Sequence, residues 1–167
     1  MRVILSLGSN IGDKHSFLSQ AINLIKSKKL IYDLKFSKIY KTEPVGIADQ
    51  DWFYNMAISG ECNLSPIDLF NELKGIEIVI GRVHRQRWHQ REIDIDIIFF
   101  DSLVINTDSL IIPHPRMQER NFVLFPVNEI QTNFIHPVLK KTVGKLLKES
   151  KDNSKVILLP ENEYYIN

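Results

Sequence analysis

Two aspartates separated by a single residue carry the clearest chemistry in this sequence. Asp94 and Asp96 alternate with Ile93, Ile95 and Ile97, a pattern typical of a β-strand. Because alternate side chains of a strand share a face, both carboxylates should lie together while the isoleucines enter the core. Two neighbouring carboxylates repel each other unless cations compensate them, and Mg²⁺ prefers such oxygen ligands. The spacing therefore predicts a site for magnesium ions that neutralise phosphate charge during transfer.

A basic segment lies directly before this acidic strand. Residues 78–91 contain no acidic side chain, and their cationic and indole side chains are Arg82, His84, Arg85, Arg87, Trp88, His89 and Arg91. Arginine presents a planar fork of donors that matches phosphate oxygens, and an indole ring can stack on a flat ligand. Connections of about 2–6 residues are usual in compact domains, so this longer charged loop indicates a mobile or functional segment.

Each of these two signals also has a simpler interpretation. An Asp-x-Asp pair can sit on a solvated sheet face and bind nothing, since charged residues are mostly exposed. An arginine-rich loop with an aromatic side chain can be a solvated loop that touches RNA. Cations beside a pair of acids are nevertheless what a polyphosphate substrate requires, so the combination favours a nucleotide site.

The elements that must position these residues follow from hydrophobic periodicity. Strands are predicted over residues 3–7, 30–40, 53–58, 93–100 and 156–159, with a short hairpin over 104–105 and 111–112. Helices are predicted over 14–28, from Pro66 behind Ser65, and over 117–124 and 142–150. This order favours an α+β, ferredoxin-like β-α-β-β-α-β sheet with helices packed on one face and a short C-terminal extension.

Length and composition restrict the functional class. The 167 residues fit one domain, 1–167, and the net charge of +1 argues against wholesale nucleic-acid binding. No apolar run approaches the ~20 residues that span a bilayer, and the N-terminus lacks the pattern of a signal peptide. The single Cys62 cannot form an internal disulfide. A cytoplasmic protein is therefore expected.

Further short motifs occur in a characteristic order along the chain. They are residues 6–10 (SLGSN), 40–46 (YKTEPVG), 53–55 (FYN), 81–82 (GR), 87–88 (RW), 91–96 (REIDID) and 113–117 (PHPRM). As an ordered set they resemble the 6-hydroxymethyl-7,8-dihydropterin pyrophosphokinases of folate biosynthesis. The likeness covers about residues 1–150 and leaves the tail after them largely uncovered.

The resemblance implies a reaction and its cofactors. The pterin hydroxymethyl oxygen would attack the β-phosphorus of ATP and release AMP, with two Mg²⁺ ions carried by Asp94 and Asp96. Arg82 and Arg91 would act on the phosphates, and Arg91 would stabilise the transition state. The family's fold is the same α+β, ferredoxin-like arrangement, and its substrates would be the partners of a monomeric enzyme that binds neither nucleic acid nor membrane.

The resemblance also implies two sets of binding residues. Those expected to contact ATP are Glu77, His84, Arg87, Trp88, Arg91, Ile97, His114 and Arg120. Those expected to contact the pterin are Thr42, Glu43, Pro44, Val45, Phe53, Asn55, Trp88, Asp94 and Phe122. Strand alternation independently places Phe53 and Asn55 on one face, and an aromatic ring beside an amide suits a pterin. Ordinary core packing of both phenylalanines, and a turn role for His114 between prolines, remain the alternatives.

Two other functional classes share some of these features. An RNA-binding α+β module would use the arginines and exposed aromatics, but Asp94 and Asp96 would repel a phosphate backbone unless metals bind. A metal-dependent nuclease would share the acidic pair, yet its additional ligands have no counterpart in the sequence. The chain also departs from the common family pattern, with His84 where arginine is common and Phe53 where tyrosine is frequent.

Overall fold

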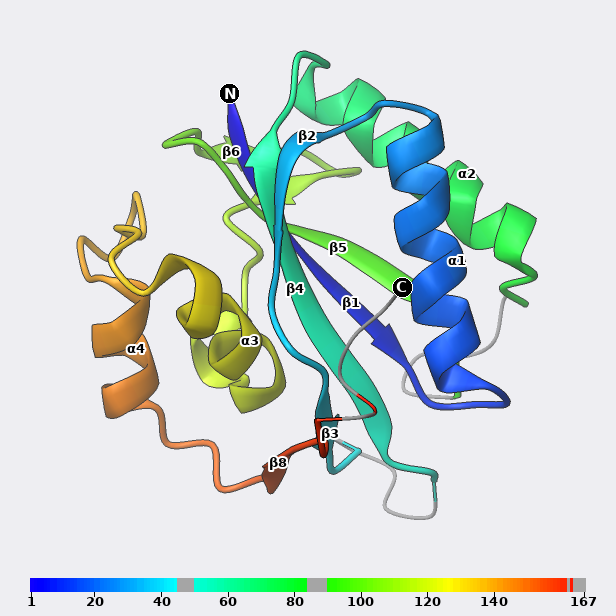
Figure 1. The fold of residues 1–167 in the computed structure, drawn as a ribbon. Helices are drawn as coiled ribbons and strands as arrows, with labels where there is room; N and C mark the ends of the chain where they lie inside the picture. The colour runs from blue at the N-terminus through cyan, green and yellow to red at the C-terminus, as the bar shows by residue number, and fades with distance from the viewer. Residues whose placement is uncertain (45–49, 84–89, 162, 164–167) are drawn as a thin grey trace.

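A six-stranded antiparallel sheet forms the centre of the computed structural model, which describes residues 1–44, 50–83, 90–161 and 163 (Figure 1). Its strands are β1 (Arg2–Ser9), β2 (Tyr32–Phe36), β3 (Tyr40–Thr42), β4 (Phe53–Glu61), β5 (Asp94–Phe100) and β8 (Val156–Leu158). They lie in the order β5-β1-β4-β3-β8, and β2 also pairs with β4. The predicted β-α-β-β-α-β succession of elements is confirmed, although the strand predicted over 30–40 is divided into β2 and β3. The predicted last strand extends the sheet at β3.

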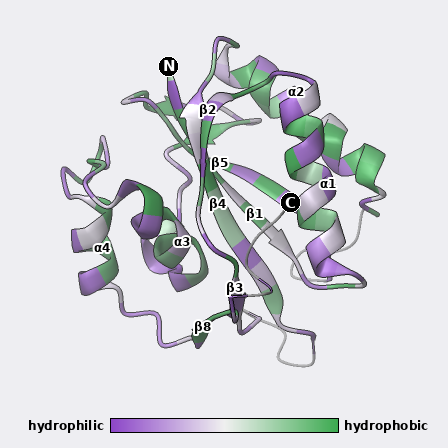
Figure 2. Cartoon of the chain, in the orientation of Figure 1, coloured by the Kyte–Doolittle hydropathy of each residue, from purple (hydrophilic) through white to green (hydrophobic). Residues whose placement is uncertain are grey.

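Helices α1 (Lys14–Ser27) and α2 (Pro66–Ile80) cover one face of the sheet. Both begin at side-chain caps: Asp13 accepts from the backbone N–H of Ser16, and Ser65 accepts from that of Asp68. Helix α2 ends at Gly81, whose φ of 103° requires glycine. In Figure 2 both helices carry hydrophobic and hydrophilic residues, as expected where one side is buried. The predicted starts of both helices are confirmed. The predicted buried side of α2 is correct at Leu73 and Ile76 and wrong at Ile67, which is exposed, because the helix instead turns Leu69 and Ile80 toward the sheet.

Helices α3 (Asn121–Gln131) and α4 (Val143–Glu149) cover the opposite face. The expectation that helices pack on one face only is therefore wrong. The reason is that the central strands are apolar on both faces, as seven of the eight β1 residues are buried. Each face of such a sheet must pack against a layer of helices or other structure to be shielded from water. Ile4 and Phe99 belong to this second core, whereas Leu5 and Ile97 belong to the first. The predicted helix over 117–124 is a 3₁₀ turn, η1 (Met117–Glu119), followed by α3.

A small hairpin of β6 (Ile105–Asn106) and β7 (Ile111–Ile112) forms as predicted. It returns the chain to the sheet, where the backbone N–H of His114 donates to the Ile98 carbonyl at 3.0 Å. The hairpin thereby places residues 114–120 beside the end of β5. Within the described residues, no helix combines the length and hydrophobicity needed to cross a membrane.

The end of β1 is tied to two later strands through Asn10, which is fully buried. Its side-chain oxygen accepts from the backbone N–H of Arg91 at 2.8 Å, and its backbone N–H donates to the Arg91 carbonyl at 3.0 Å. Its amide nitrogen donates to Gln50 Oε1 at 3.1 Å and to the Asp51 carbonyl at 3.3 Å. One side chain thus holds the segments that lead into β4 and β5.

Replacing Asn10 by alanine should lower the free energy of unfolding by about 1–3 kcal/mol, because it leaves buried polar groups without partners. Urea denaturation would measure the loss, with Asn106→Ala as the control, since Asn106 is exposed on β6. Equal stability losses in the two variants would contradict the role assigned to Asn10.

Candidate active site

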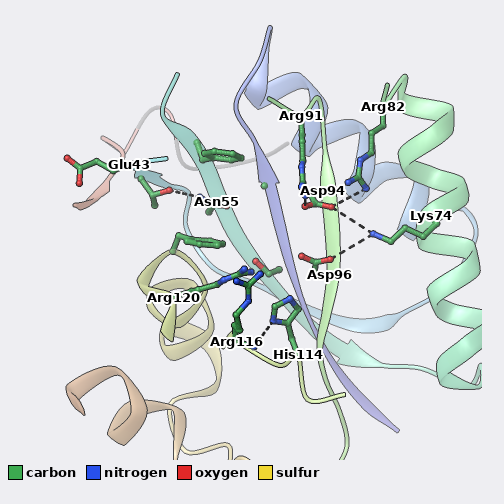
Figure 3. Close-up of a pocket in the computed structure, with 15 residues that line it drawn as sticks. Glu43, Asn55, Lys74, Arg82, Arg91, Asp94, Asp96, His114, Arg116 and Arg120 are labelled. Carbon is green, nitrogen blue, oxygen red and sulfur yellow. Dashed lines mark hydrogen bonds and ion pairs between the residues drawn. The ribbon is translucent and has the colours of Figure 1, made fainter. Parts of the chain in front are cut away.

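A cavity of about 330 Å³ opens where β1, β3, β4 and β5 meet the ends of α2 and α3 (Figure 3). It brings together residues from six segments that are distant in the sequence. Its lining side chains and backbone come from Ser6, Gly8, Thr42, Glu43, Phe53, Asn55, Lys74, Arg82, Arg91, Asp94, Asp96, His114, Arg116, Arg120 and Phe122. Most of the residues predicted from the sequence to form the site are among them.

The acidic pair lies on β5 with the alternation that its spacing predicted. Asp94 and Asp96 line the cavity, whereas Ile93, Ile95 and Ile97 are at most 5% exposed and belong to the core. On the neighbouring strand β1, Gly8 is opposite Asp94 and Ser6 is opposite Asp96. A Cβ atom on Gly8 would lie 2.6 Å from Asn55 Oδ1, so glycine there leaves the room that Asn55 occupies.

Cations from the basic segment and from α2 surround Asp94. Arg91 forms an ion pair with Asp94, Arg82 Nη1 lies 3.1 Å from Asp94 Oδ1, and Lys74 Nζ lies 3.9 Å from the same oxygen. Burial alone would raise the pKa of this carboxyl, but the positive charges of Arg91, Lys74 and Arg82 lower it below its usual value. Asp94 is therefore ionised throughout the neutral range.

In the described part of the chain, fewer positive charges lie near the carboxylate of Asp96 than near that of Asp94. Lys74 Nζ lies 3.9 Å from Asp96 Oδ1. A dashed line marks this ion pair in Figure 3. Burial, the charge of Asp94 and the charge of Glu77 together raise the pKa of Asp96 to about 7. The side chain keeps 40% of its exposure, because it faces the cavity. The result is an accessible carboxylate that gains from an added cation.

Glu77 on α2 organises the cations from behind the acidic strand. It is 2% exposed, and its Oε1 accepts from the backbone N–H of Ile95 and from Lys74 Nζ, each at 2.7 Å. Its other oxygen forms an ion pair with Arg82. Glu77 thereby fixes two cations that reach the cavity while it is not itself part of the lining. Ile97, also expected near ATP, lies in the core between the sheet and helices α1 and α2.

The aromatic and amide residues gather at the other end of the cavity. Asn55 Nδ2 donates to Thr42 Oγ1 at 2.7 Å, and both side chains are at most 3% exposed. Phe53 is opposite Thr42 in the β3–β4 register, while Tyr54 packs against the core. The guanidinium of Arg120 lies 5.5 Å from the ring centroid of Phe122. Phe53 and Phe122 thus line the cavity, and neither is wholly enclosed in the core.

A third group of side chains comes from the segment after β7. His114, Arg116 and Arg120 point toward the acidic strand from the side opposite Arg82 (Figure 3). Burial and the charges of Arg120 and Arg116 lower the pKa of His114 to about 4. The imidazole is therefore neutral at pH 7, and its Nδ1 faces the backbone N–H of Arg116 at 3.4 Å.

Sequence reasoning missed two cations of this cavity. Lys74 is one of them, although it stands three residues before Glu77 on a predicted helix, a spacing that brings side chains together. Arg116 is the other, although it lies inside the motif over residues 113–117.

Four expected residues, Val45, His84, Arg87 and Trp88, lie outside the described part of the chain. Pro44 is half-buried beside Glu43 and is not among the lining residues.

The donor set fits magnesium. Among the described residues no group of three or more His, Cys, Asp or Glu side chains is arranged to enclose a metal ion. Mg²⁺ commonly uses only one or two carboxylates and completes its coordination with water and substrate phosphates. Asp94 and Asp96, adjacent on one strand face and open to the cavity, match that requirement.

Asp96→Asn should stabilise the metal-free protein at pH 8. The folded-state pKa of about 7 lies above the ordinary value of 3.8, so ionised Asp96 costs stability above pH 7 and nothing below about pH 4. The variant should gain about 1 kcal/mol at pH 8, since solvent screens a side chain that is 40% exposed. Urea denaturation with a chelator at pH 8 and pH 4.5 would measure it, with exposed Asp108→Asn as control. A gain of the same size at both pH values would contradict the assignment.

Comparison with known proteins agrees with this geometry. A model of the 7,8-dihydro-6-hydroxymethylpterin-pyrophosphokinase family matches residues 4–132. The chain is 44% identical over 126 residues to the 2-amino-4-hydroxy-6-hydroxymethyldihydropteridine pyrophosphokinase of Bacillus subtilis, covering 75% of each protein. It is 36% identical over 148 residues to the enzyme of the same name from Aquifex aeolicus, covering 89% of this chain and 91% of the relative.

Solved structures show the same fold at lower sequence identity. A Plasmodium falciparum HPPK-DHPS triple mutant superposes with a TM-score of 0.71 at 17% identity, covering 89% of this chain and 44% of that one. An HPPK-DHPS complex with substrates gives a TM-score of 0.70 at 15% identity, covering 88% of this chain and 43% of that one. The family match and the relatives confirm the resemblance seen in the ordered motifs. The chain belongs to the 7,8-dihydro-6-hydroxymethylpterin-pyrophosphokinase family and transfers a pyrophosphoryl group to hydroxymethyldihydropterin in folate synthesis.

Proposed function

We propose that the cationic and aromatic ends of this cavity bind the two substrates of the reaction, ATP and the pterin, with the acidic pair between them. The observation that carries the proposal is the division of one cavity into two chemically distinct parts. Lys74, Arg82 and Arg91 gather around the acidic pair, whereas Phe53, Asn55 and Phe122 line the other part. A polyphosphate suits the first surface and a flat, hydrogen-bonding ring suits the second.

The arginines would exchange partners when ATP binds. Arg82 and Arg91 pair with Asp94 in the metal-free protein, so they are already aimed at the site of transfer. When cations take over the compensation of Asp94, these guanidinium groups become available to phosphate oxygens. His114 and Arg120 approach from the opposite side and suit the remainder of the nucleotide. These four side chains would contribute both to binding ATP in the ground state and to stabilising the transition state.

Asp94 and Asp96 would hold two Mg²⁺ ions together with phosphate oxygens of ATP. When bound there, the metal neutralises charge on the phosphates and aligns them for in-line attack. The chain contributes a fixed separation of the two carboxylates, because both project from one strand that is buried on its opposite face. Lys74, held by Glu77, is the chain's own cation at this point and limits repulsion between the acids before any metal arrives.

The pterin would lie between Phe53 and Phe122 with its polar edge toward Asn55 and the backbone after Thr42. The hydrogen bond from Asn55 to Thr42 leaves the amide oxygen and the second amide hydrogen to read a ligand edge. A pterin ring presents both donors and acceptors, so an amide is a suitable partner. Glu43 lines the cavity next to this position, and Asp94 lies on the side where the hydroxymethyl group must meet the phosphates.

We further propose a monomer that works in the cytoplasm. All the lining residues named above come from a single chain, so the described part of the site needs no second copy. Cys62 is buried and unpaired, which suits a reducing compartment. Light scattering coupled to gel filtration at micromolar concentration should give a mass close to 19.4 kDa. A mass of twice that value would contradict the monomer.

Asp94→Ala and Asp96→Ala should each lower kcat by about 10³-fold, because each removes a carboxylate that positions charge-neutralising ions. Pterin affinity, measured by fluorescence in the absence of nucleotide, should survive in the Asp96 variant. AMP release from ATP and Mg²⁺ with and without 6-hydroxymethyl-7,8-dihydropterin is the assay, and exposed Asp108→Ala is the matched control. Near-normal turnover in either site variant would refute the metal assignment.

Arg91→Ala should lower kcat by about 10²–10³-fold while the KM for ATP changes little, because its contact is expected to strengthen in the transition state. Arg91→Lys should recover only part of the rate, since an ammonium group lacks the fork of donors. Initial rates over a range of ATP concentrations would separate the two parameters. A variant whose only defect is a higher KM would assign Arg91 to ground-state binding instead.

A further inference from the structure

The segment after α4 connects two walls of the cavity that are otherwise separate. Residues 152–159, here called the C-terminal brace, contact the start of α3 at one end and pair with β3 at the other. In Figure 1 the chain leaves the end of α4 and runs below α3 to β8, beside β3. The family match ends at residue 132, so the brace lies beyond the part of the chain that the family model describes.

Asp152 supplies the cap that α3 lacks. The residue at the N-cap position is Arg120, and its side chain makes no capping hydrogen bond. The backbone N–H of Asn121 donates to Asp152 Oδ2 at 2.7 Å, and Asn121 Nδ2 donates to the Asp152 carbonyl at 2.7 Å. A carboxylate at a helix N-terminus satisfies a free N–H and interacts favourably with the helix dipole. Asp152 therefore anchors the first turn of α3, which carries Phe122.

Asp152 is itself held in place by the brace. The backbone N–H of Ser154 donates to Asp152 Oδ1 at 2.9 Å, and the backbone N–H of Asp152 donates to Ser150 Oγ at 3.2 Å. One carboxylate oxygen thus contacts α3 and the other contacts the brace. The position of α3 is coupled to the backbone that follows Asp152.

The other end of the brace holds the opposite wall. Thr42 is paired with Val156, and the backbone N–H of Glu43 donates to the Lys155 carbonyl at 3.1 Å. The backbone N–H of Lys155 donates to Glu43 Oε2 at 2.9 Å, which orients the Glu43 side chain. Leu159 is 6% exposed and belongs to the core, so the end of the brace is anchored in the protein interior.

We propose that the C-terminal brace sets the separation between Phe122 and the Thr42–Glu43 backbone, with Asp152 as a positioning residue for the pterin. This inference rests on the pterin placement proposed above. Asp152 itself does not line the cavity, so its influence passes through Asn121 to Phe122. The ATP-binding groups on α2 and β5 have no such connection to the brace through the hydrogen bonds described here. Arg120, which directly precedes Asn121, is the proposed ATP contact that shares the connection, so pterin affinity should depend on the brace more strongly than ATP affinity.

The test is a split between the two substrates. Asp152→Ala should raise the Kd and KM for the pterin by about tenfold, since a misplacement of about 1 Å at a binding wall can cost up to about 100-fold. The KM for ATP should rise by no more than about twofold, because Arg82 and Arg91, which lie away from the brace, should still contact the phosphates. Asp152→Asn keeps an acceptor for the Asn121 N–H and should restore part of the pterin affinity, and it also serves if the alanine variant folds poorly.

Thr142→Ala is the matched control. Thr142 caps α4 through its hydroxyl, which accepts from the backbone N–H of Lys145 at 3.2 Å, and it is not among the residues that line the cavity. Its loss should lower the Tm without raising the pterin Kd. The proposed role of the brace would be overturned by a pterin Kd that is unchanged in Asp152→Ala, or by one that rises equally in Thr142→Ala.

Phe53→Ala and Phe122→Ala separate this inference from the placement on which it rests. If both weaken pterin binding while Asp152→Ala does not, the placement stands and the brace is wrong. If neither weakens binding, the pterin lies elsewhere and both proposals fall. Weaker pterin binding in all three variants, with a smaller effect on ATP in Asp152→Ala, would support the proposal.

Discussion

The architecture of this enzyme depends on one buried carboxylate, that of Glu77. It accepts a hydrogen bond from the backbone of β5 while it pairs with Lys74 and Arg82, so it joins helix α2, strand β5 and two cations in a single network. A buried charge is costly unless it is paired and hydrogen-bonded, and Glu77 is both. The network fixes the helix against the strand at the point where the acidic pair leaves the core. The chemistry of the cavity is thereby tied to the packing of the fold.

The surrounding charges are balanced unevenly, and this imbalance has a functional use. Asp94 is enclosed by cations that lower its pKa, whereas burial and neighbouring acids raise the pKa of Asp96 to about 7. A site whose charges were fully satisfied would gain little from a metal ion or a polyphosphate. A carboxylate with little positive charge around it, such as Asp96, leaves a place for a cation in the cavity. A carboxyl whose pKa is raised in the folded state lowers stability at pH values above that pKa.

The cavity also shows why a two-faced sheet suits a two-substrate reaction. Helix α2 packs against β5 on one face of the sheet, and α3 packs on the opposite face, mainly against β4. Side chains from both layers therefore meet at the end of the sheet. Cations come from α2 and from the segment before β5, while Phe122 and Arg120 come from α3. The C-terminal segment contributes to the same arrangement, because it contacts α3 and β3 at once. Residues far apart in sequence thus define one binding surface.

Local pattern alone determined much of this protein. The alternation of isoleucine and aspartate set the faces of β5, the Ser65-Pro66 pair set the start of α2, and the ordered motifs identified the family. These features depend on nearest neighbours along the chain, where the period of a strand or a helix cap applies directly. Only the tertiary structure decided which layer covers each sheet face, that Glu77 lies behind the cations, and that Lys74 and Arg116 reach the cavity. It also decided that Asp152 caps a helix beginning 31 residues earlier. Such contacts are made between segments distant in sequence, and no local period encodes which distant backbone or charge a side chain will meet.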